Sequence, residues 1–568
     1  MAWAEDLRPD KTSCRLATVE RCGVSDARGS AMLETPVLIV GAGPVGLTAA
    51  IALSQHGIRS VLVERHPSTS IAPKARGINA RTMEMYRQMG IEDDIRAAGM
   101  PARYGKMILW AESLAGREIN RLEPGRGSAA SRMMSPAGNC GCSQDILEPI
   151  LRRHAEALAP DSMRFNTELT ELKQDASGVS GVLTDLVKQA TIPFHARYVV
   201  AADGTRSSVR DALQIGRTGE RDIYDSVNVH FRADLRPWVE DRPAALYLIE
   251  QPDFRATFLT VNGTDRWGFL VHSLSAYGFT RENLTPERCV ALVRRAVGAP
   301  DLPVEVLGIS FWNCSAMVAD RFSDGNIFLV GDAAHETTPS GGFGMNLGVQ
   351  DAQNLAWKMA AVLHGEAAPS LLDTYDAERR PHASEVVQAT LLNMQSFDRT
   401  ARQIEAKLPR KEFLNERGLI FGACYRSTAV VPDGSPPPVT SVTEYEPSAH
   451  PGCRAPHVWL ARNGERISTI DLVGRGFVLL TASGGEAWRA AVNQRGLPRI
   501  DLHAIGEELI DAEAGWMNAY GVQEGGAVLV RPDGYVAWRA ASLPDDPVRV
   551  LAEVFAHLLG RQLNTQAA

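Results

Sequence analysis

The chain has 568 residues, of which 45% are hydrophobic and 22% charged, and its net charge is −8 with a pI near 6.0. This length exceeds what one hydrophobic core organises, so we expect two or three domains. The acidic balance argues against nucleic acid or an anionic membrane as the main partner, because both repel a net-negative protein.

The first segment, 1–31, is polar and mixed in charge, so we expect a disordered tail rather than a secretory signal. Thr35–Leu53 is uncharged over about the length of a membrane span. It has glycines at 41, 43 and 46 and a proline at 44, however, which favour a strand, a turn and a helix. We therefore expect a cytoplasmic protein with no membrane partner.

The eight cysteines are scattered along the chain, and no two of them have CxxC spacing. Cys140 and Cys142 are too close together for a paired metal knuckle. We predict reduced thiols and no bound metal.

A βαβ unit begins the first domain, with an apolar strand over 37–40, a helix over 45–56 and a strand over 60–64. Such a unit binds a dinucleotide when glycines let the backbone approach a pyrophosphate at the helix N-terminus. An acid, Glu64, ends the second strand, where it would bond a ribose hydroxyl, and an acid favours FAD or NAD over NADP. The turn between strand and helix has the G-x-G-x-x-G fingerprint of dinucleotide-binding proteins, with Gly41, Gly43, Pro44 and Gly46. We find no second fingerprint of this kind.

The middle of the chain, about 223–315, is rich in alternating β-type segments, which predict an antiparallel sheet forming one wall of a pocket. Amphipathic helices are predicted before it, over 81–89 and 145–158. We expect four residues on this sheet, each either structural or lining the pocket: Tyr224, His230, Arg255 and Trp267.

Two further acids follow buried strands. Asp203 follows the strand over 196–202, and Asp332 follows the strand over 326–330. Each could be a simple turn residue, because Asp and Gly are common in turns. Asp332 leads into a loop with four glycines and then into a predicted helix.

The C-terminal part begins after a proline-rich linker at Pro432–Pro438. Strand-like and helical segments alternate over 455–560, which predicts a separate α/β domain.

These motifs, in this order, resemble the FAD-dependent aromatic hydroxylases typified by para-hydroxybenzoate hydroxylase. The resemblance covers about 35–400 and rests on VLIVGAGPVGLTAAIAL, VVAADGTRSSVR and FLVGDAAHETTPSGGFGMNLGVQDAQNLAWKMAAVL. The tail over 450–545 resembles the thioredoxin-like domain of phenol and polyketide hydroxylases, without a CxxC pair. The implied fold class is α/β: a Rossmann-like FAD-binding domain with an inserted antiparallel β-sheet substrate domain and a C-terminal thioredoxin-like α/β domain.

The domain boundaries predicted on this basis are given together. They are a tail over 1–31, a discontinuous FAD-binding domain over 32–215 and 316–400, a substrate domain over 216–315, a helical segment and linker over 401–450, and a thioredoxin-like domain over 451–568.

The resemblance also implies which residues bind FAD. The glycine turn, Glu64 and Arg65 would hold the ADP half, and Asp332 would bond the ribityl chain. Backbone N–H groups at the start of the last helix would bond the reduced, anionic ring. The full set implied is Gly41, Gly43, Pro44, Gly46, Glu64, Arg65, Arg76, Gln144, Asp203, Asp332, Pro339, Gly342, Gly344, Met345 and Asn346.

Catalytic roles are less sharply indicated. Pro339, Tyr224 and Arg255 are the candidates, Pro339 because it would fix the loop where oxygen adds. Arg206 and Arg210 are candidates for NADPH phosphates or plain surface charges. We interpret His335 as a loop residue beside the cofactor, and Arg379 is interpreted as structural. 

The predicted activity is hydroxylation of a phenolic ring, in which NAD(P)H reduces FAD and a flavin hydroperoxide transfers oxygen from O2. The extra domain favours a polycyclic, polyketide-type substrate. Hydroxylation of a simple phenol and Baeyer–Villiger oxygenation are alternatives, as is a non-catalytic FAD-binding interaction protein. A flavin-dependent halogenase is disfavoured because the WxWxIP motif is absent. We expect a monomer or a homodimer.

Overall fold

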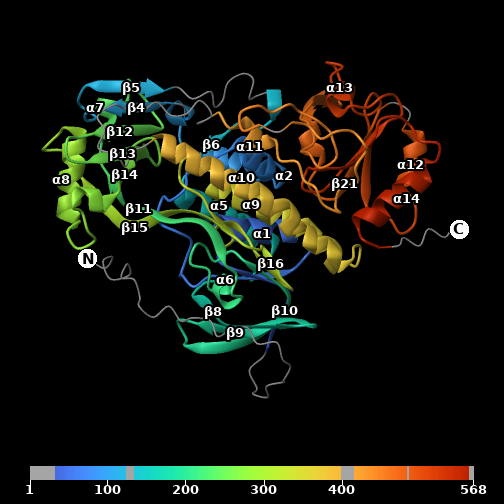
Figure 1. The fold of residues 1–568 in the computed structure, drawn as a ribbon, viewed down its shortest axis with the longest axis horizontal. Helices are drawn as coiled ribbons and strands as arrows, with labels where there is room; N and C mark the ends of the chain where they lie inside the picture. Colours follow the sequence, from blue (N-terminus) through green and yellow to red (C-terminus); the bar gives the residue numbers. More distant parts are fainter. Residues whose placement is uncertain are drawn as a thin grey trace.

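The computed structural model describes residues 32–105, 107–122, 133–397, 415–439, 441–482 and 485–561. The predicted tail over 1–31 and the helical segment predicted from 401 as far as 414 lie outside the described residues. In Figure 1 a large antiparallel sheet and the C-terminal domain lie at opposite ends of the molecule, with the helices of the nucleotide-binding domain between them.

The first domain contains an eight-stranded sheet whose centre is parallel. β1 pairs in parallel with both β2 and β10, and β10 pairs in parallel with β17. The second half of β1 is an unbroken buried run of Val and Ile with one Leu, as expected where a parallel sheet is covered on both faces. The strands are β1 (Leu33–Val40), β2 (Ser60–Val63), β7 (Met163–Arg164), β8 (Thr167–Asp175), β9 (Gly178–Asp185), β10 (Ala190–Ala201), β16 (Ser323–Asp324) and β17 (Ile327–Leu329).

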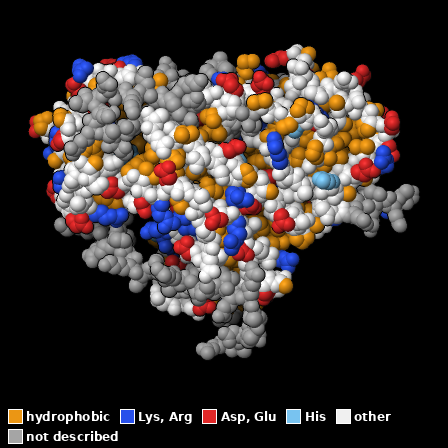
Figure 2. All heavy atoms as spheres, in the orientation of Figure 1, with side chains coloured by type: hydrophobic (Ala, Val, Ile, Leu, Met, Phe, Trp, Pro, Cys, Tyr) orange, Lys and Arg blue, Asp and Glu red, His pale blue; other side chains and the backbone are white. Residues whose placement is uncertain are grey.

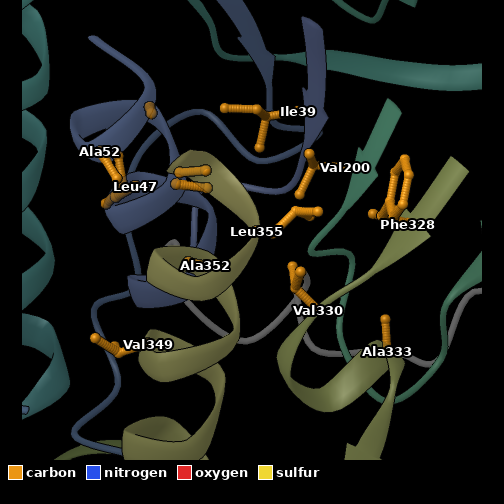
Figure 3. Packing of buried hydrophobic residues seen from close by; sticks show 14 of the residues in the cluster. Ile39, Leu47, Ala52, Val200, Phe328, Val330, Ala333, Val349, Ala352 and Leu355 are labelled. Carbon is orange, nitrogen blue, oxygen red and sulfur yellow. The ribbon is translucent and has the colours of Figure 1, made fainter. Parts of the chain in front are cut away.

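Two helices cover this sheet next to the predicted nucleotide site. α1 (Pro44–Gln55) and α9 (Gly344–Leu363) pack against each other and are buried along most of their length. Figure 3 shows Leu355 of α9 directed toward Val200 of β10, while Leu47 and Ala52 of α1 lie together on the other side of α9. The sheet edge and the start of α9 are therefore held by one continuous core.

The remaining helices of this domain include the two predicted from sequence, which are confirmed as α2 and α5. They are α2 (Ala80–Gln88), α3 (Glu92–Ala98), α5 (Gln144–Leu158), α6 (Ser208–Ala212), α10 (Asp373–Phe397) and α11 (Arg417–Phe421), with short 3-10 turns η1 (Ala102–Gly105), η3 (Gly331–Ala333) and η4 (Pro369–Leu372) and a small β3 (Gly77–Ile78) to β6 (Cys140–Gly141) pair.

The second sheet also has eight strands, and it draws on more of the chain than the predicted 216–315. β4 and β5 come from the segment assigned to the FAD-binding domain, and β18 comes from the glycine-rich loop region. β4 pairs in parallel with β12, which is distant in sequence, so periodicity alone did not place it in this sheet, whereas β5 forms a hairpin with β4, and β18 pairs with β15. The elements are β4 (Ile108–Ala111), β5 (Glu118–Leu122), β11 (Arg217–Arg232), α7 (Arg236–Val239), β12 (Leu246–Glu250), β13 (Arg255–Thr260), β14 (Arg266–His272), η2 (Leu274–Tyr277), α8 (Pro286–Val297), β15 (Glu305–Ala319) and β18 (His335–Glu336).

The C-terminal domain is built on a four-stranded sheet in the order β22-β21-β23-β24, with a separate β19–β20 hairpin. This confirms the predicted α/β character. Its elements are β19 (Trp459–Arg462), β20 (Glu465–Ser468), η5 (Thr469–Leu472), β21 (Phe477–Thr481), α12 (Glu486–Val492), β22 (Ile500–Ala504), α13 (Trp516–Tyr520), β23 (Ala527–Val530), β24 (Val536–Ala540) and α14 (Pro547–Leu558).

Buried ion pairs join this domain to the nucleotide-binding domain. Arg531 lies 2.6 Å from Glu378 of α10 and 2.5 Å from Asp533, and Lys358 of α9 lies 2.7 Å from the same Glu378. Arg454 forms a second buried pair with Glu84 of α2. We call this set the ionic seam.

The surface carries no large field of one sign in the view of Figure 2, where acidic and basic side chains are interspersed. None of the helices in the part of the chain that the structure describes combines the length and hydropathy of a membrane span.

Candidate active site

The glycine turn between β1 and α1 has two kinds of glycine. A Cβ on Gly41, whose φ is +105°, would lie 2.4 Å from Ala202 O, and one on Gly46 would lie 2.0 Å from Gly41 O. A Cβ on Gly43 would meet nothing within 4 Å. Gly41 and Gly46 therefore permit close packing inside the protein, whereas Gly43 leaves open space at the N-terminus of α1. Pro44 occupies the first turn, and no side chain caps the helix, so its N–H groups can face an anion.

Glu64 follows β2 and reaches back to this turn. Its Oε2 accepts a hydrogen bond of 2.8 Å from Ala42 N, and its Oε1 accepts one of 2.9 Å from His66 N. Arg65 is exposed beside it. The acid predicted for a ribose is thus positioned against the predicted pyrophosphate turn.

Asp203 and Asp332 emerge at one edge of the sheet, because β10 and β17 are adjacent and parallel. Asp203 Oδ2 accepts from Val209 N at 3.2 Å, but its Oδ1 is buried without a hydrogen-bond partner. Burial raises the pKa of Asp203. Desolvation by surrounding protein also raises the pKa of Asp332, although that residue reaches solvent. Asp332 is partly desolvated by the surrounding protein and still reaches solvent, so its carboxylate is suited to bind a polar ligand.

The glycine-rich loop leaves β18, an edge strand of the second sheet, and ends at the N-terminus of α9. Gly341 and Gly342 have φ of +118° and +70°, which favour glycine. Phe343 precedes the helix and supplies no capping side chain. The first N–H groups, on Gly344, Met345 and Asn346, therefore form an anion-binding end with bare backbone around it. Pro339 lies exposed at the start of this loop.

The side chain of Asn346 serves the protein rather than a ligand. Its Nδ2 donates to Gly77 O at 2.9 Å and to Gly342 O at 2.7 Å, and its Oδ1 accepts from Asn79 N at 2.9 Å. It fixes the glycine loop to β3, so only its backbone remains for the predicted cofactor contact.

Arg76 and Gln144, also predicted to touch the cofactor, make protein contacts. Arg76 donates to Thr260 O at 3.1 Å and to Ala245 O, both in the second sheet region. Burial lowers its pKa to about 10. Gln144 Nε2 donates to Glu148 at 2.6 Å at the start of α5.

His335 and Arg379 are structural. His335 Nε2 lies 2.6 Å from Asp351, and Arg379 Nε lies 2.7 Å from the same carboxylate, with all three side chains buried. Burial alone would raise the pKa of Asp351, but the His335 and Arg379 charges bring it below its ordinary value. Arg379 also donates to Leu347 O at 3.1 Å, so this triad positions the start of α9.

The second sheet has one apolar and one polar face. Val227 and Val229 of β11 lie in a core, whereas the alternating Ser226, Asn228 and His230 share the other face. An ion pair between Asp145 and Arg266, next to His230, turns this polar face toward the first domain. The polar face is therefore joined to α5 of the first domain by this ion pair.

A row of rings crosses the polar face. Tyr224 lies edge-on to His272 with ring centroids 5.3 Å apart and to Trp312 at 6.1 Å, and His272 lies 5.9 Å from Trp312. Ser226, which pairs with both His272 and Trp312 across the strands, lies 2.8 Å from His272 Nδ1. His272 and Trp312 were not singled out from sequence. They could have been found by alternation once the register with β11 was known.

Unpaired and perturbed groups lie on the same face. Asn228 Oδ1 is buried and has no hydrogen-bond partner. Desolvation and the neighbouring Arg266 charge lower the pKa of His230 to about 4. Arg255, a predicted catalytic residue, is 2.6 Å from Glu250 at the β12–β13 end.

One sequence interpretation is wrong, and another is decided between its alternatives. Of the two roles considered for Trp267, the structural one holds and the pocket-lining one does not: it is 0% exposed and packs in the core on the apolar face, because it pairs with Phe231. Arg210 is not a surface charge available for phosphates, since it is 2% exposed and donates to Ala333 O at 3.1 Å. Arg206 is exposed.

The residues fit FAD. Open space beside Gly43, an acid at the turn, a buried unpaired Asp203 oxygen, an accessible Asp332 and the uncapped α9 offer partners for a pyrophosphate, sugars and an anionic ring.

Comparisons with known proteins agree with this geometry. Residues 34–390 match the family described as an FAD binding domain, and 448–562 match the family described as aromatic-ring hydroxylase, C-terminal. Tetracenomycin B2 monooxygenase-dioxygenase of Streptomyces olivaceus is 39% identical over 553 residues, 93% of this chain and 99% of the relative. 4-Methyl-5-nitrocatechol 5-monooxygenase of Burkholderia sp. is 36% identical over 559 residues, 93% of this chain and 98% of the relative.

Among solved structures, a ternary complex of aklavinone-11 hydroxylase with FAD and aklavinone superposes with a TM-score of 0.83 at 37% identity, covering 94% of this chain and 100% of that one. The two family matches together cover residues 34–390 and 448–562, and this solved structure contains FAD, the predicted cofactor. The chain therefore belongs to the FAD-dependent aromatic-ring hydroxylases, monooxygenases that use NAD(P)H and O2.

Proposed function

We propose that this enzyme hydroxylates a polycyclic phenol of polyketide type on the polar face of the second sheet. The observation that carries the proposal is the row of Tyr224, His272 and Trp312, an extended aromatic surface with a hydroxyl and an imidazole on it. A fused-ring substrate offers more stacking area to such a row than a single ring does. Relatives whose names refer to a polyketide and relatives whose names refer to a single-ring phenol both support the reaction class.

Within this proposal, Gly43 faces the pyrophosphate, Glu64 the ADP ribose and Asp332 the ribityl chain. Backbone N–H groups of Gly344 and Met345 face the ring and favour its negative charge once it is reduced. Bound FAD would pass electrons from NAD(P)H to O2, and O2 would supply both the oxygen atom transferred to the phenol and the one that leaves as water.

The chain's own side chains act on the substrate. Ser226 holds the His272 ring at 2.8 Å, so that His272 and Tyr224 orient the phenol and assist the loss of its proton. Arg255 balances the phenolate charge, although Glu250 already neutralises part of its own. Pro339 limits the freedom of the loop beside the ring, and the close domain contact excludes water from the reacting atoms.

The test compares NAD(P)H consumption with hydroxylated product formed from aklavinone and from a single-ring phenol. We expect the polycyclic phenol to couple consumption to product, and the single-ring phenol to give mostly hydrogen peroxide. Efficient, coupled hydroxylation of the single-ring phenol alone would replace this proposal by simple phenol hydroxylation. Formation of a lactone from a ketone would support Baeyer–Villiger oxygenation instead.

The proposed setting is the cytoplasm, where NAD(P)H is available, and all six cysteines that the structure describes are free thiols. We propose a monomer or a homodimer, which sedimentation of the FAD-bound enzyme distinguishes.

A further inference from the structure

Three potential metal ligands meet between the nucleotide-binding and C-terminal domains, away from the active site. The ligand atoms of Cys424, His450 and Cys453 all lie within 4.8 Å of one another, and the two sulfurs are 3.0 Å apart. We propose that these residues bind one Zn²⁺ ion, or a similar thiolate-preferring cation. We call them the Cys-His-Cys cluster.

The backbone is built to present these side chains together. Cys424 and Cys453 face each other in an antiparallel bridge, flanked by a hydrogen bond of 2.8 Å from Tyr425 N to Gly452 O. The turn from His450 to Cys453 closes with a 3.0 Å hydrogen bond from Cys453 N to His450 O. Gly452 has φ of +93°, and a Cβ there would lie 2.2 Å from Tyr425 O. The turn thus needs glycine and yields an HxxC pair of the spacing used in metal knuckles.

His450 has one ring nitrogen available to bind a metal. His450 Nε2 lies 3.2 Å from Ser435 O, and a carbonyl only accepts, so Nε2 carries the hydrogen. Nδ1 is then the nitrogen with a lone pair, and it is buried without a hydrogen-bond partner. Metal-binding histidines are commonly fixed in this way, with the second nitrogen donating to a carbonyl.

The donor set selects the kind of ion. Two thiolates and a neutral imidazole balance a divalent charge and suit Zn²⁺, whereas Mg²⁺ and Ca²⁺ prefer oxygen.

This inference departs from the sequence-based expectation of no metal. That expectation considered cysteine pairs, and the cluster instead combines an HxxC turn with a cysteine before the proline-rich linker. A metal here would tie residues on both sides of the linker together, so it would stabilise the position of the C-terminal domain.

The test uses the full-length, FAD-bound protein under a phosphine reductant, titrated with Co²⁺ as a spectroscopic probe and with Zn²⁺. We expect one ion per chain, a thiolate-to-cobalt charge-transfer band and the visible bands of a tetrahedral site. Zn²⁺ should displace Co²⁺ and protect Cys424 and Cys453, among all the cysteines, from alkylation mapped by mass spectrometry.

Variants separate this cluster from other thiols. Cys453→Ser and His450→Gln should each weaken Co²⁺ binding by roughly 100-fold or more. Cys289→Ser, a buried free thiol on α8, should bind as the wild type does. If a variant is unstable, the alkylation pattern of the wild type alone decides. Failure of the reduced wild type to take up an ion, or a 424–453 disulfide that persists under reductant, overturns the proposal.

Discussion

The nucleotide-binding domain contacts the C-terminal domain on one side and the second sheet on the other, and the two contacts differ in how their buried polar groups are hydrogen-bonded. In the ionic seam toward the C-terminal domain, all three nitrogens of Arg531 donate to carboxylates, and both oxygens of Glu378 accept. Toward the second sheet, an oxygen of Asp203 and one of Asn228 are buried without partners, and α9 is uncapped. The satisfied charges of the ionic seam indicate a structural role, whereas the unpaired oxygens of Asp203 and Asn228 are candidates for contacts with ligands.

The largest test of this contrast is Arg531→Met. Removing the guanidinium leaves the buried Glu378 and Asp533 without their partner, so we expect the free energy of unfolding to fall by about 3–5 kcal/mol. Denaturant titration measures it. Arg549→Met is the matched control, because Arg549 pairs with Glu553 on an exposed helix face and should change nothing measurable. Equal effects of the two variants would contradict the assignment of the seam as structural.

The glycine turn sharpens the contrast within one motif. Gly46→Ala places a Cβ 2.0 Å from Gly41 O, so we expect the FAD-free protein to lose about 1–3 kcal/mol of stability. Gly43→Ala meets no protein atom, so the FAD-free protein should melt as the wild type does while FAD affinity falls roughly tenfold or more. Thermal melting and FAD titration separate the two. An FAD affinity unchanged in Gly43→Ala would place the pyrophosphate elsewhere.

Asn228→Leu tests the unpaired oxygen on the polar face. Because a buried acceptor without a partner is costly, the substrate-free enzyme should gain about 1 kcal/mol of stability. The KM for the phenol should rise roughly tenfold if that oxygen accepts a substrate hydroxyl. Asn228→Asp, which keeps an acceptor, serves as the control. A stability gain with an unchanged KM would show that Asn228 Oδ1 does not bind the substrate.

The smallest expected effect is a pH dependence of FAD binding through Asp332. Burial raises the pKa of this group in the FAD-free protein, and sugar hydroxyls donate best to the ionised form. FAD affinity should therefore rise as pH increases through that raised pKa, from about pH 4 toward neutrality, and then level off. Asp332→Asn should bind FAD less tightly and lose this slope. The same slope in both forms would assign the titration to another group.

The sequence predicted those features that depend on neighbours along the chain. The turn at Gly41–Gly46, the strand-end acids and the start of α9 all follow from a strand passing into a turn and a helix. Features set by pairing between distant strands escaped it. For Trp267 the sequence left a structural and a pocket-lining role open, and its register with β11 turns it into the core, while β4 joins a sheet formed mainly by residues far downstream.

Contacts between a charged side chain and a carbonyl far away in the chain could not be predicted from the sequence either. The sequence predicted Arg210 as a charged residue on the surface of a helix. Its guanidinium instead donates a hydrogen bond to Ala333 O, which is 123 residues away in the chain. The Cys-His-Cys cluster likewise depends on a bridge between segments that no local pattern connects.

The contacts of Arg76 and Asn346 link the two halves of the active site mechanically. Arg76 holds Thr260 of the second sheet, its neighbour Gly77 accepts from Asn346, and Asn346 holds Gly342 of the glycine loop. A shift of the sheet on substrate binding would pass through these few bonds to the cofactor loop. Cofactor and substrate should then bind cooperatively, and thermodynamic reciprocity requires each to change the affinity of the other by the same factor.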